Sequence, residues 1–264
     1  MKTNQDTYKF QYIYGPVPSW RLGSSLGIDL LSQKEKICSY DCLYCQLGKT
    51  KMVTVTRQVY VPEDDILKEL DMLPQDISID YLTLSGRGEP TLAKNLGSMI
   101  KLLKGERKEP IAVITNASLM NRHDVREELS YANFVIAKLD ACSQESLMEV
   151  NKPLPEMRFE NVLEGMKIFR KHFRGKMALQ VMFMRENAKY ACAIAEIARE
   201  INPDEVQINT PLRPCAVESL GKKELTRIKN IFAGLNVISV YESRKKYVKP
   251  ISDGDTLKRR GKVL

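Results

Sequence analysis

Hydrophobic residues along the chain follow two alternating patterns. Short apolar runs rich in valine and isoleucine predict strands at residues 27–30, 79–84, 111–115, 134–139, 177–183, 205–209 and 237–241. Between these runs, apolar positions recur every three or four residues and predict helices at residues 61–73, 94–103, 121–129, 143–150, 157–173, 187–200 and 224–232. Alternating strands and helices are typical of right-handed βαβ units, so the pattern predicts an α/β fold with a parallel sheet.

Positive charge is concentrated at the C-terminal end. The 264-residue chain has a formal charge of +8, and residues 244–264 hold eight basic and two acidic residues, which is +6 of that total. Such a tail either contacts RNA phosphates or is a solvated end without a partner. The last fifteen or so residues show no clear apolar period and are expected to be loosely held. No repeat or linker divides the first 243 residues.

The N-terminal sequence MKTNQDTYKF is polar and lacks the apolar stretch of a secretion signal. No apolar run reaches the roughly 20 residues that cross a bilayer, so no membrane partner is expected. The expected location is the cytoplasm. Because cytosolic thiols are kept reduced, clustered cysteines there bind metal or take part in chemistry more often than they form disulfides.

Polar or glycine-rich residues follow several of the predicted strands. Strand 79–84 is followed by SGRGEP, and other strands end at Asn116, Asp140, Met184, Asn209 and Thr210. In parallel α/β barrels the carboxyl ends of the strands form the active site. We therefore expect a polar mouth, of a size that suits a small ligand, at this end of the fold.

Residues 38–45, CSYDCLYC, hold three of the six cysteines. A structural zinc site usually needs four ligands, and since His123 and His172 lie far along the chain, zinc would need a lone cysteine as its fourth ligand. A four-iron cluster suits soft sulfur ligands, and three thiolates leave one iron open to a substrate or cofactor. Small buried side chains are the role expected of the other cysteines, Cys142, Cys192 and Cys215.

CSYDCLYC resembles the CxxxCxΦC loop of the radical S-adenosylmethionine (SAM) superfamily, in which Φ is an aromatic residue, here Tyr44. The resemblance implies a [4Fe–4S] cluster held by Cys38, Cys42 and Cys45, with SAM on the fourth iron and Tyr44 near its adenine. It also implies reductive cleavage of SAM to a 5′-deoxyadenosyl radical, which abstracts hydrogen from a substrate. A ferredoxin or flavodoxin is the electron donor that this superfamily implies.

The segment SGRGEPTL, residues 85–92, resembles the GGEP motif of the same superfamily. Gly86 and Gly88 would let the backbone approach the ligand, and Glu89 would accept hydrogen bonds from an ammonium group. Further cofactor contacts are expected from the ends and inner faces of the strands, at Asn116, Lys138, Asp140, Gln180 and Asn209.

Two of these strand residues keep a second interpretation. Met182 lies on a strand that would line the same cavity, and it is either a cavity residue or a core side chain. Lys138 lies two residues before Asp140 and therefore shares its face of the strand. The lysine either pairs with the SAM carboxylate or is held by Asp140.

Two further segments, 14–30 (YGPVPSWRLGSSLGIDL) and 207–214 (QINTPLRP), resemble a small archaeal and bacterial radical SAM group that is catalogued near the wyosine tRNA-base synthases. Those synthases carry additional upstream cysteines, and no cysteine precedes Cys38 here. Their Schiff-base lysine has no matching position either. Wyosine chemistry is therefore not expected, although an RNA substrate stays open.

Several residues of these segments have two open interpretations. Ser19, Arg21 and Arg213 either bind an anionic substrate or form ion pairs at the barrel rim. Trp20 stands where many members of the group have arginine, and no role is assigned to it. Cys215 is either a lone thiol or an auxiliary ligand or hydrogen donor.

Together these features predict an α/β fold in the form of a partial (β/α)6 TIM-like barrel. Residues 1–243 would form the radical SAM barrel with an N-terminal segment and a C-terminal strand, and residues 244–264 the basic tail. A tRNA or other RNA base is one candidate substrate, and a peptide or small metabolite is the alternative. A metal-stabilised RNA-binding module without enzymatic activity is the competing class.

Overall fold

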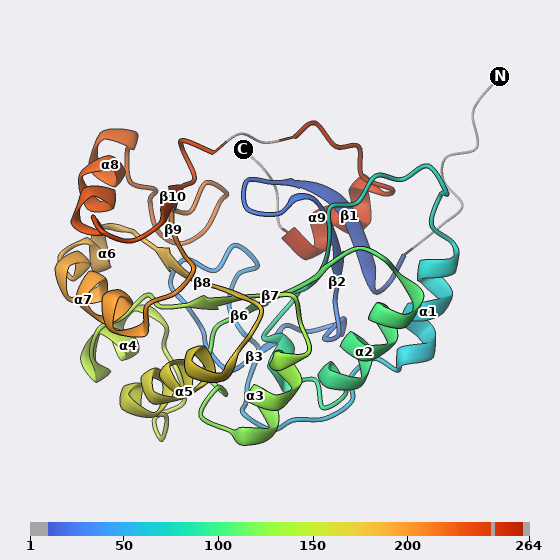
Figure 1. The fold of residues 1–264 in the computed structure, drawn as a ribbon, viewed down its shortest axis with the longest axis horizontal. Coiled ribbons are helices and arrows are strands. Elements are labelled where there is room, and N and C mark those ends of the chain that lie inside the picture. Colours follow the sequence, from blue (N-terminus) through green and yellow to red (C-terminus); the bar gives the residue numbers. More distant parts are fainter. Residues whose placement is uncertain (1–9, 244–245, 261–264) are drawn as a thin grey trace.

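A curved sheet forms the centre of the protein, and the computed structural model describes residues 10–243 and 246–260 (Figure 1). In these residues the main sheet has eight strands in the order β1-β2-β5-β6-β7-β8-β9-β10. Their bounds are β1 Ile13–Ser19, β2 Gly23–Ile28, β5 Tyr81–Leu84, β6 Ile111–Thr115, β7 Phe134–Lys138, β8 Lys176–Met182, β9 Glu205–Asn209 and β10 Val237–Ser239. From β2 to β10 the neighbouring strands are parallel, and the sheet curls into a half-barrel. The predicted α/β partial barrel is confirmed.

Helices cover the outer face of the half-barrel (Figure 1). Their bounds are α1 Glu63–Asp71, α2 Leu96–Glu106, α3 His123–Ser130, α4 Gln144–Val150, α5 Phe159–His172, α6 Arg185–Ala188, α7 Ala191–Ile201, α8 Lys222–Ile231 and α9 Asp253–Arg260, with a 3-10 turn, η1, at Pro90–Leu92. The predicted helix 187–200 is interrupted between α6 and α7. None of the helices in the described part of the chain has the length and apolar character needed to span a membrane.

The first strand, β1, is absent from the prediction. Its sequence IYGPVPS contains two prolines and a glycine, which weaken a strand pattern, and it pairs antiparallel with β2. β1 lies at the edge of the sheet, where proline is tolerated because one side of the strand forms no ladder. The predicted strand 27–30 overlaps β2, which ends at Ile28.

Apolar side chains fill the interior of the half-barrel near the amino ends of its parallel strands. Leu22, Ala112, Phe134, Ile136 and Ala178 form a buried cluster there. The main core lies between the outer face of the sheet and the helices. Polar side chains therefore occupy the other end of the interior, at the carboxyl ends of the parallel strands.

The C-terminal segment packs on β1. The Ile251 amide donates a hydrogen bond to the Gly15 carbonyl at 2.6 Å, and the Gly15 amide donates to the Thr256 hydroxyl at 3.1 Å. The Lys246 ammonium pairs with Asp80 at 2.5 Å. The expectation of a loosely held end is therefore wrong for residues 251–256. Most of them belong to the short helix α9, which the sequence analysis did not predict.

Candidate functional site

The cysteine loop is attached to the half-barrel on two sides. Its first residues form strand β3 (Ile37–Cys38), which pairs with β4 (Met52–Val53), and Ile37 also forms a parallel bridge with Gly88. On the other side, the Asp41 and Leu43 amides donate to carbonyls at the end of α4, at 3.0 Å each. These contacts fix the loop above the carboxyl ends of the strands.

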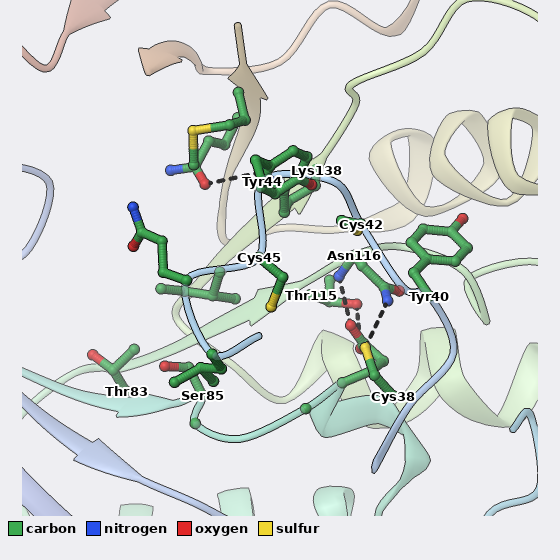
Figure 2. Close-up of a pocket in the computed structure, with 18 of the residues that line it drawn as sticks. Cys38, Tyr40, Cys42, Tyr44, Cys45, Thr83, Ser85, Thr115, Asn116 and Lys138 are labelled. Carbon is green, nitrogen blue, oxygen red and sulfur yellow. Dashed lines mark hydrogen bonds between the residues drawn. The ribbon is translucent and has the colours of Figure 1, made fainter. Parts of the chain in front are cut away.

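The three cysteines of the loop line one cavity of about 280 Å³, and Figure 2 shows them around it. A side-chain nitrogen faces each sulfur. The donor–sulfur distances are 3.7 Å from Asn116 Nδ2 to Cys38 Sγ, 3.4 Å from Asn151 Nδ2 to Cys42 Sγ, and 2.9 Å from Lys36 Nζ to Cys45 Sγ. Hydrogen bonds from N–H groups to ligand sulfurs are the outer-shell contacts that tune iron–sulfur clusters.

Burial holds two of these thiols in the protonated form. It raises the pKa of Cys38 to about 12, with a further increase from the neighbouring Cys42. Burial also raises the pKa of Cys42 to about 11, although the hydrogen bond from Asn151 acts to lower it. Because metals bind thiolates, a soft metal centre would have to displace these protons.

The donor set at this cavity consists of three cysteine sulfurs. Across residues 10–243 and 246–260, no three His, Cys, Asp or Glu side chains are arranged to hold one metal ion. The three sulfurs are instead distributed around a cavity, and sulfur ligands in this number suit a cubane with one open iron.

Glu89 lies on the wall of the same cavity and is 2% exposed. Its Oε1 accepts hydrogen bonds from the Thr91 amide (3.1 Å), the Thr91 hydroxyl (2.7 Å) and the Thr115 hydroxyl (2.6 Å), and its Oε2 accepts one from the Asn116 amide (2.6 Å). Burial raises the pKa of Glu89, while these hydrogen bonds act to lower it. The carboxylate is thus oriented before any ligand arrives.

Gly86 and Gly88 line the cavity, but close packing within the protein already requires them to be glycine. A Cβ on Gly88 would lie 1.8 Å from the Ile37 carbonyl oxygen, and one on Gly86 would lie 2.2 Å from Asp29 Cγ. Gly88 therefore allows the cysteine loop to approach the strand end. The sequence interpretation attributed this freedom to ligand approach alone.

Tyr44, the aromatic residue of the loop, is buried and held by a polar network. Its hydroxyl donates to the Asp140 carboxylate, and the Lys138 ammonium lies 4.8 Å from its ring centroid. Asp140 also accepts from the Met182 amide (2.7 Å) and from Asn151 Nδ2 (3.2 Å). Asp140 thus fixes the position of Tyr44 from behind the cavity wall.

Most of the predicted site residues meet at this cavity. Those that line it are Cys38, Cys42, Tyr44, Cys45, Gly86, Gly88, Glu89, Asn116, Lys138, Gln180 and Met182, together with Ser19, Arg21 and Arg213. Asp140 and Asn209 are buried but are not among the lining residues. Lys138 lies 3.4 Å from both Asp140 and Gln180, as the second interpretation of this lysine expects.

The lone cysteines match their expected role only in part, since Cys142 packs against the main core. Cys192 is exposed, and Cys142 and Cys215 are only partly buried. Cys215 donates to the Val217 carbonyl at 3.2 Å and is not among the residues that line the cavity. Its position gives no support to a role as an auxiliary ligand.

Lys36 and Asn151 were missed by sequence reasoning. Lys36 precedes the cysteine loop by two residues, and Asn151 caps the end of α4 in the segment EVNKP. The position of Lys36, two residues before Cys38, placed a lysine near the loop, but strand alternation does not predict its contact with Cys45. No comparable signal marked Asn151, because its proximity to Cys42 depends on the tertiary fold.

The chain matches a known protein family. Residues 36–198 match the pattern of the radical SAM superfamily, and the chain belongs to that superfamily. Members are enzymes that use a [4Fe–4S] cluster and SAM. Among its relatives, a UPF0026 protein of Synechocystis is 41% identical over 207 residues, which cover 78% of this chain and 77% of that protein. A UPF0026 protein of Methanocaldococcus jannaschii is 36% identical over 232 residues, covering 85% and 71%.

Solved structures share the fold. Streptococcus suis SuiB, bound to its precursor peptide SuiA, superimposes with a TM-score of 0.61 and 15% identity, over 81% of this chain and 48% of that one. The protein anSMEcpe with bound AdoMet gives a TM-score of 0.59 and 19% identity, over 82% and 64%. At these identities the likeness describes the architecture, and it agrees with the half-barrel found here.

Proposed function

We propose that this chain binds a [4Fe–4S] cluster through Cys38, Cys42 and Cys45 and cleaves SAM reductively to start a hydrogen abstraction. The observation that carries the proposal is the meeting of three thiols and the pre-oriented Glu89 carboxylate at one cavity. When bound, the cluster supplies the electron that cleaves SAM to methionine and a 5′-deoxyadenosyl radical. The electron donor would be a ferredoxin or flavodoxin, and its binding surface is not assigned.

The protein's own residues have separate proposed roles. Glu89 accepts a hydrogen bond from the SAM ammonium group through Oε2, which has one protein donor, the Asn116 amide, whereas Oε1 has three. Tyr44 forms an aromatic wall for the adenine, and Asp140 acts through Tyr44 by holding its hydroxyl. Gln180 and Asn116 offer their side-chain amide groups to the cofactor. Asn209 does not line the cavity, and its contact with the cofactor stays a prediction.

Anaerobic reconstitution tests the proposal directly. We expect iron and sulfide in the ratio of one four-iron cluster per chain, and release of 5′-deoxyadenosine when SAM and dithionite are added. Cys42→Ala should lose both. Cys192→Ala is the matched control, since this cysteine is exposed and away from the loop, and it should keep both. One tightly bound zinc with no iron would support the RNA-binding module instead.

The role of Glu89 has its own test. Glu89→Gln keeps the shape of the side chain but removes the charge, so SAM affinity should fall about tenfold or more while iron content is kept. Glu69→Gln is a matched control, because Glu69 is also buried and accepts backbone hydrogen bonds from Gln11, Tyr12 and Ile13. Glu69 is not among the lining residues, so equal losses in SAM affinity would refute the assigned role.

An RNA base remains a proposed substrate through the basic tail. Deletion of residues 244–264 would also remove the contacts to β1, so charge neutralisation is the sharper experiment. Replacing Lys258, Arg259, Arg260 and Lys262 by glutamine should weaken tRNA binding and reduce its salt dependence by up to about four charges. An unchanged salt slope would remove the support for RNA.

A further inference from the structure

A row of polar side chains crosses the interior of the half-barrel. Its five members come from three neighbouring strands: Lys138 of β7, Lys176 and Gln180 of β8, and Glu205 and Gln207 of β9. Lys138 and Gln180 line the cavity, and the other three lie outside its lining. Because Lys176 and Glu205 are the first residues of their strands, the row runs from the amino ends of these strands to the candidate site.

Hydrogen bonds join the members of the row end to end. The Lys138 ammonium donates to Gln180 Oε1 at 3.4 Å, and Gln180 Nε2 donates to Gln207 Oε1 at 3.3 Å. Gln207 Nε2 donates to Glu205 Oε1 at 2.8 Å, and Glu205 Oε2 accepts from the Lys176 ammonium, also at 2.8 Å. Gln207 is completely buried, and Gln180 and Glu205 are 3% and 8% exposed.

The two ends of the row fix the direction of the hydrogen bonds between them. A lysine ammonium can only donate, and a carboxylate can only accept. Each glutamine amide must therefore turn its oxygen toward Lys138 and its nitrogen toward Glu205. If the Gln180 amide were turned over, its nitrogen would face the Lys138 ammonium and its oxygen would face Gln207 Oε1. Gln180 thus keeps its carbonyl oxygen on the side where Lys138 lies.

A row of this kind is costly to bury. The neighbouring interior is filled by apolar side chains, among them Phe134, Ile136 and Ala178, and apolar residues throughout would avoid the desolvation of charged groups. Each buried member of the row has a hydrogen-bond partner, and a satisfied network of this kind is rigid. The rigidity is useful at the end of the row that lines the cavity.

We propose that Glu205 is a positioning residue for the candidate site and acts through Gln207 on the amide of Gln180. It holds the Gln180 carbonyl oxygen as a fixed acceptor, which the bound molecule meets with an N–H or O–H group. One lone pair of this oxygen accepts from Lys138, and the other serves the ligand. This inference rests on the proposed function, in which Gln180 contacts SAM. SAM carries suitable donors on its ammonium, ribose and adenine groups.

Two variants separate the direction of the row from its ion pair. Lys176→Met removes the partly exposed partner of Glu205 but leaves the carboxylate to accept from Gln207, so the row should be kept. The double variant Lys176→Glu/Glu205→Lys keeps an ion pair but places a donor where the row needs an acceptor. In calorimetric titrations of the reconstituted chain with SAM, we expect the double variant to bind about tenfold more weakly. Lys176→Met should bind as the unmodified chain does.

A second measurement needs neither the cluster nor SAM, and it serves if the double variant does not fold. In nitrogen-15 NMR spectra of the apoprotein, the side-chain N–H protons of Gln180 and Gln207 should exchange slowly with solvent. Glu205→Met leaves Gln207 without its acceptor and should accelerate this exchange about tenfold. Glu205→Gln still offers an acceptor oxygen and should accelerate it far less, and Lys176→Met should leave it unchanged.

Three results would overturn the inference. The first is a folded double variant that binds SAM as tightly as the unmodified chain. The second is an equal loss of affinity in Lys176→Met, which would assign the effect to the ion pair. The third is rapid exchange of both glutamine side chains in the unmodified chain. Iron content and melting temperature are recorded for every variant. A chain that takes up no cluster, or that releases no 5′-deoxyadenosine, would instead mark the failure of the proposed function.

Discussion

Substitution of Gly88 by alanine tests how the cysteine loop is held. The added Cβ would lie 1.8 Å from the Ile37 carbonyl oxygen, whereas real Cβ atoms essentially never come closer than 3.0 Å to another heavy atom. The two segments must therefore separate by about 1.2 Å. Because the opposing atom belongs to the backbone, no change of rotamer relieves the contact.

This displacement acts directly on the proposed cluster site. Ile37 precedes Cys38, so moving one moves the other. Overpacking of this kind costs typically about 1–3 kcal/mol, and more where the backbone must shift. We expect Gly88→Ala to lower the free energy of unfolding of the apoprotein by about that amount in urea titrations. Iron bound per chain after anaerobic reconstitution should fall with it.

Gly105→Ala provides the control within the same chain. Gly105 lies in α2, and a Cβ there would have no neighbour within 4 Å. Alanine in a helix is favoured over glycine by about 0.5–1 kcal/mol, so this variant should be slightly more stable and should bind the full amount of iron. The reasoning is refuted if Gly88→Ala matches Gly105→Ala in both stability and iron content.

Two further predictions concern the thiols. With pKa values near 12 for Cys38 and 11 for Cys42, against an ordinary 9.0, both apoprotein thiols should resist iodoacetamide at pH 8 while the exposed Cys192 reacts. The raised pKa values stabilise the apoprotein below about pH 9, and this stability is lost as the pH rises through 11 and 12. Rapid alkylation of all three thiols, followed by mass spectrometry, would contradict this. Lys36→Met removes a buried cation 2.9 Å from Cys45, so the cluster should become harder to reduce, with a tenfold change in the reduction equilibrium equal to about 59 mV. An unchanged midpoint potential in an EPR-monitored titration would refute this role of Lys36.

The sequence was sufficient for the parallel part of the fold and for most of the residues that line the candidate site. Buried parallel strands produce continuous apolar runs, and cysteine spacing is a local property, so both can be read along the chain. β1 and α9 could not be predicted in this way. Each gains its stability from the other: the Gly15 amide and carbonyl of β1 hydrogen-bond residues more than 200 positions away.

The function of a residue was harder to predict than its presence at the site. Asp140 lies at a strand end, as expected, but its carboxylate faces Tyr44 and the Met182 amide rather than the cavity. Strand alternation predicts which face a side chain shares, and it cannot predict which group on a distant loop will form a hydrogen bond with it. The same limit applies to Lys36, whose ammonium turns toward Cys45.

Two asparagines connect the thiols of the cysteine loop to Glu89 and Asp140. The side chain of Asn116 donates to Cys38, and its backbone amide donates to Glu89. The side chain of Asn151 donates to both Cys42 and Asp140. Each asparagine therefore contacts one proposed cluster ligand and one residue assigned to the proposed SAM site. Networks of buried hydrogen bonds are strongly coupled, because a group left without its partner pays the full cost of desolvation. Glu89 and Tyr44 are already held by the hydrogen bonds that also reach the thiols, so replacing either asparagine by alanine should lower both the iron bound after reconstitution and the SAM affinity.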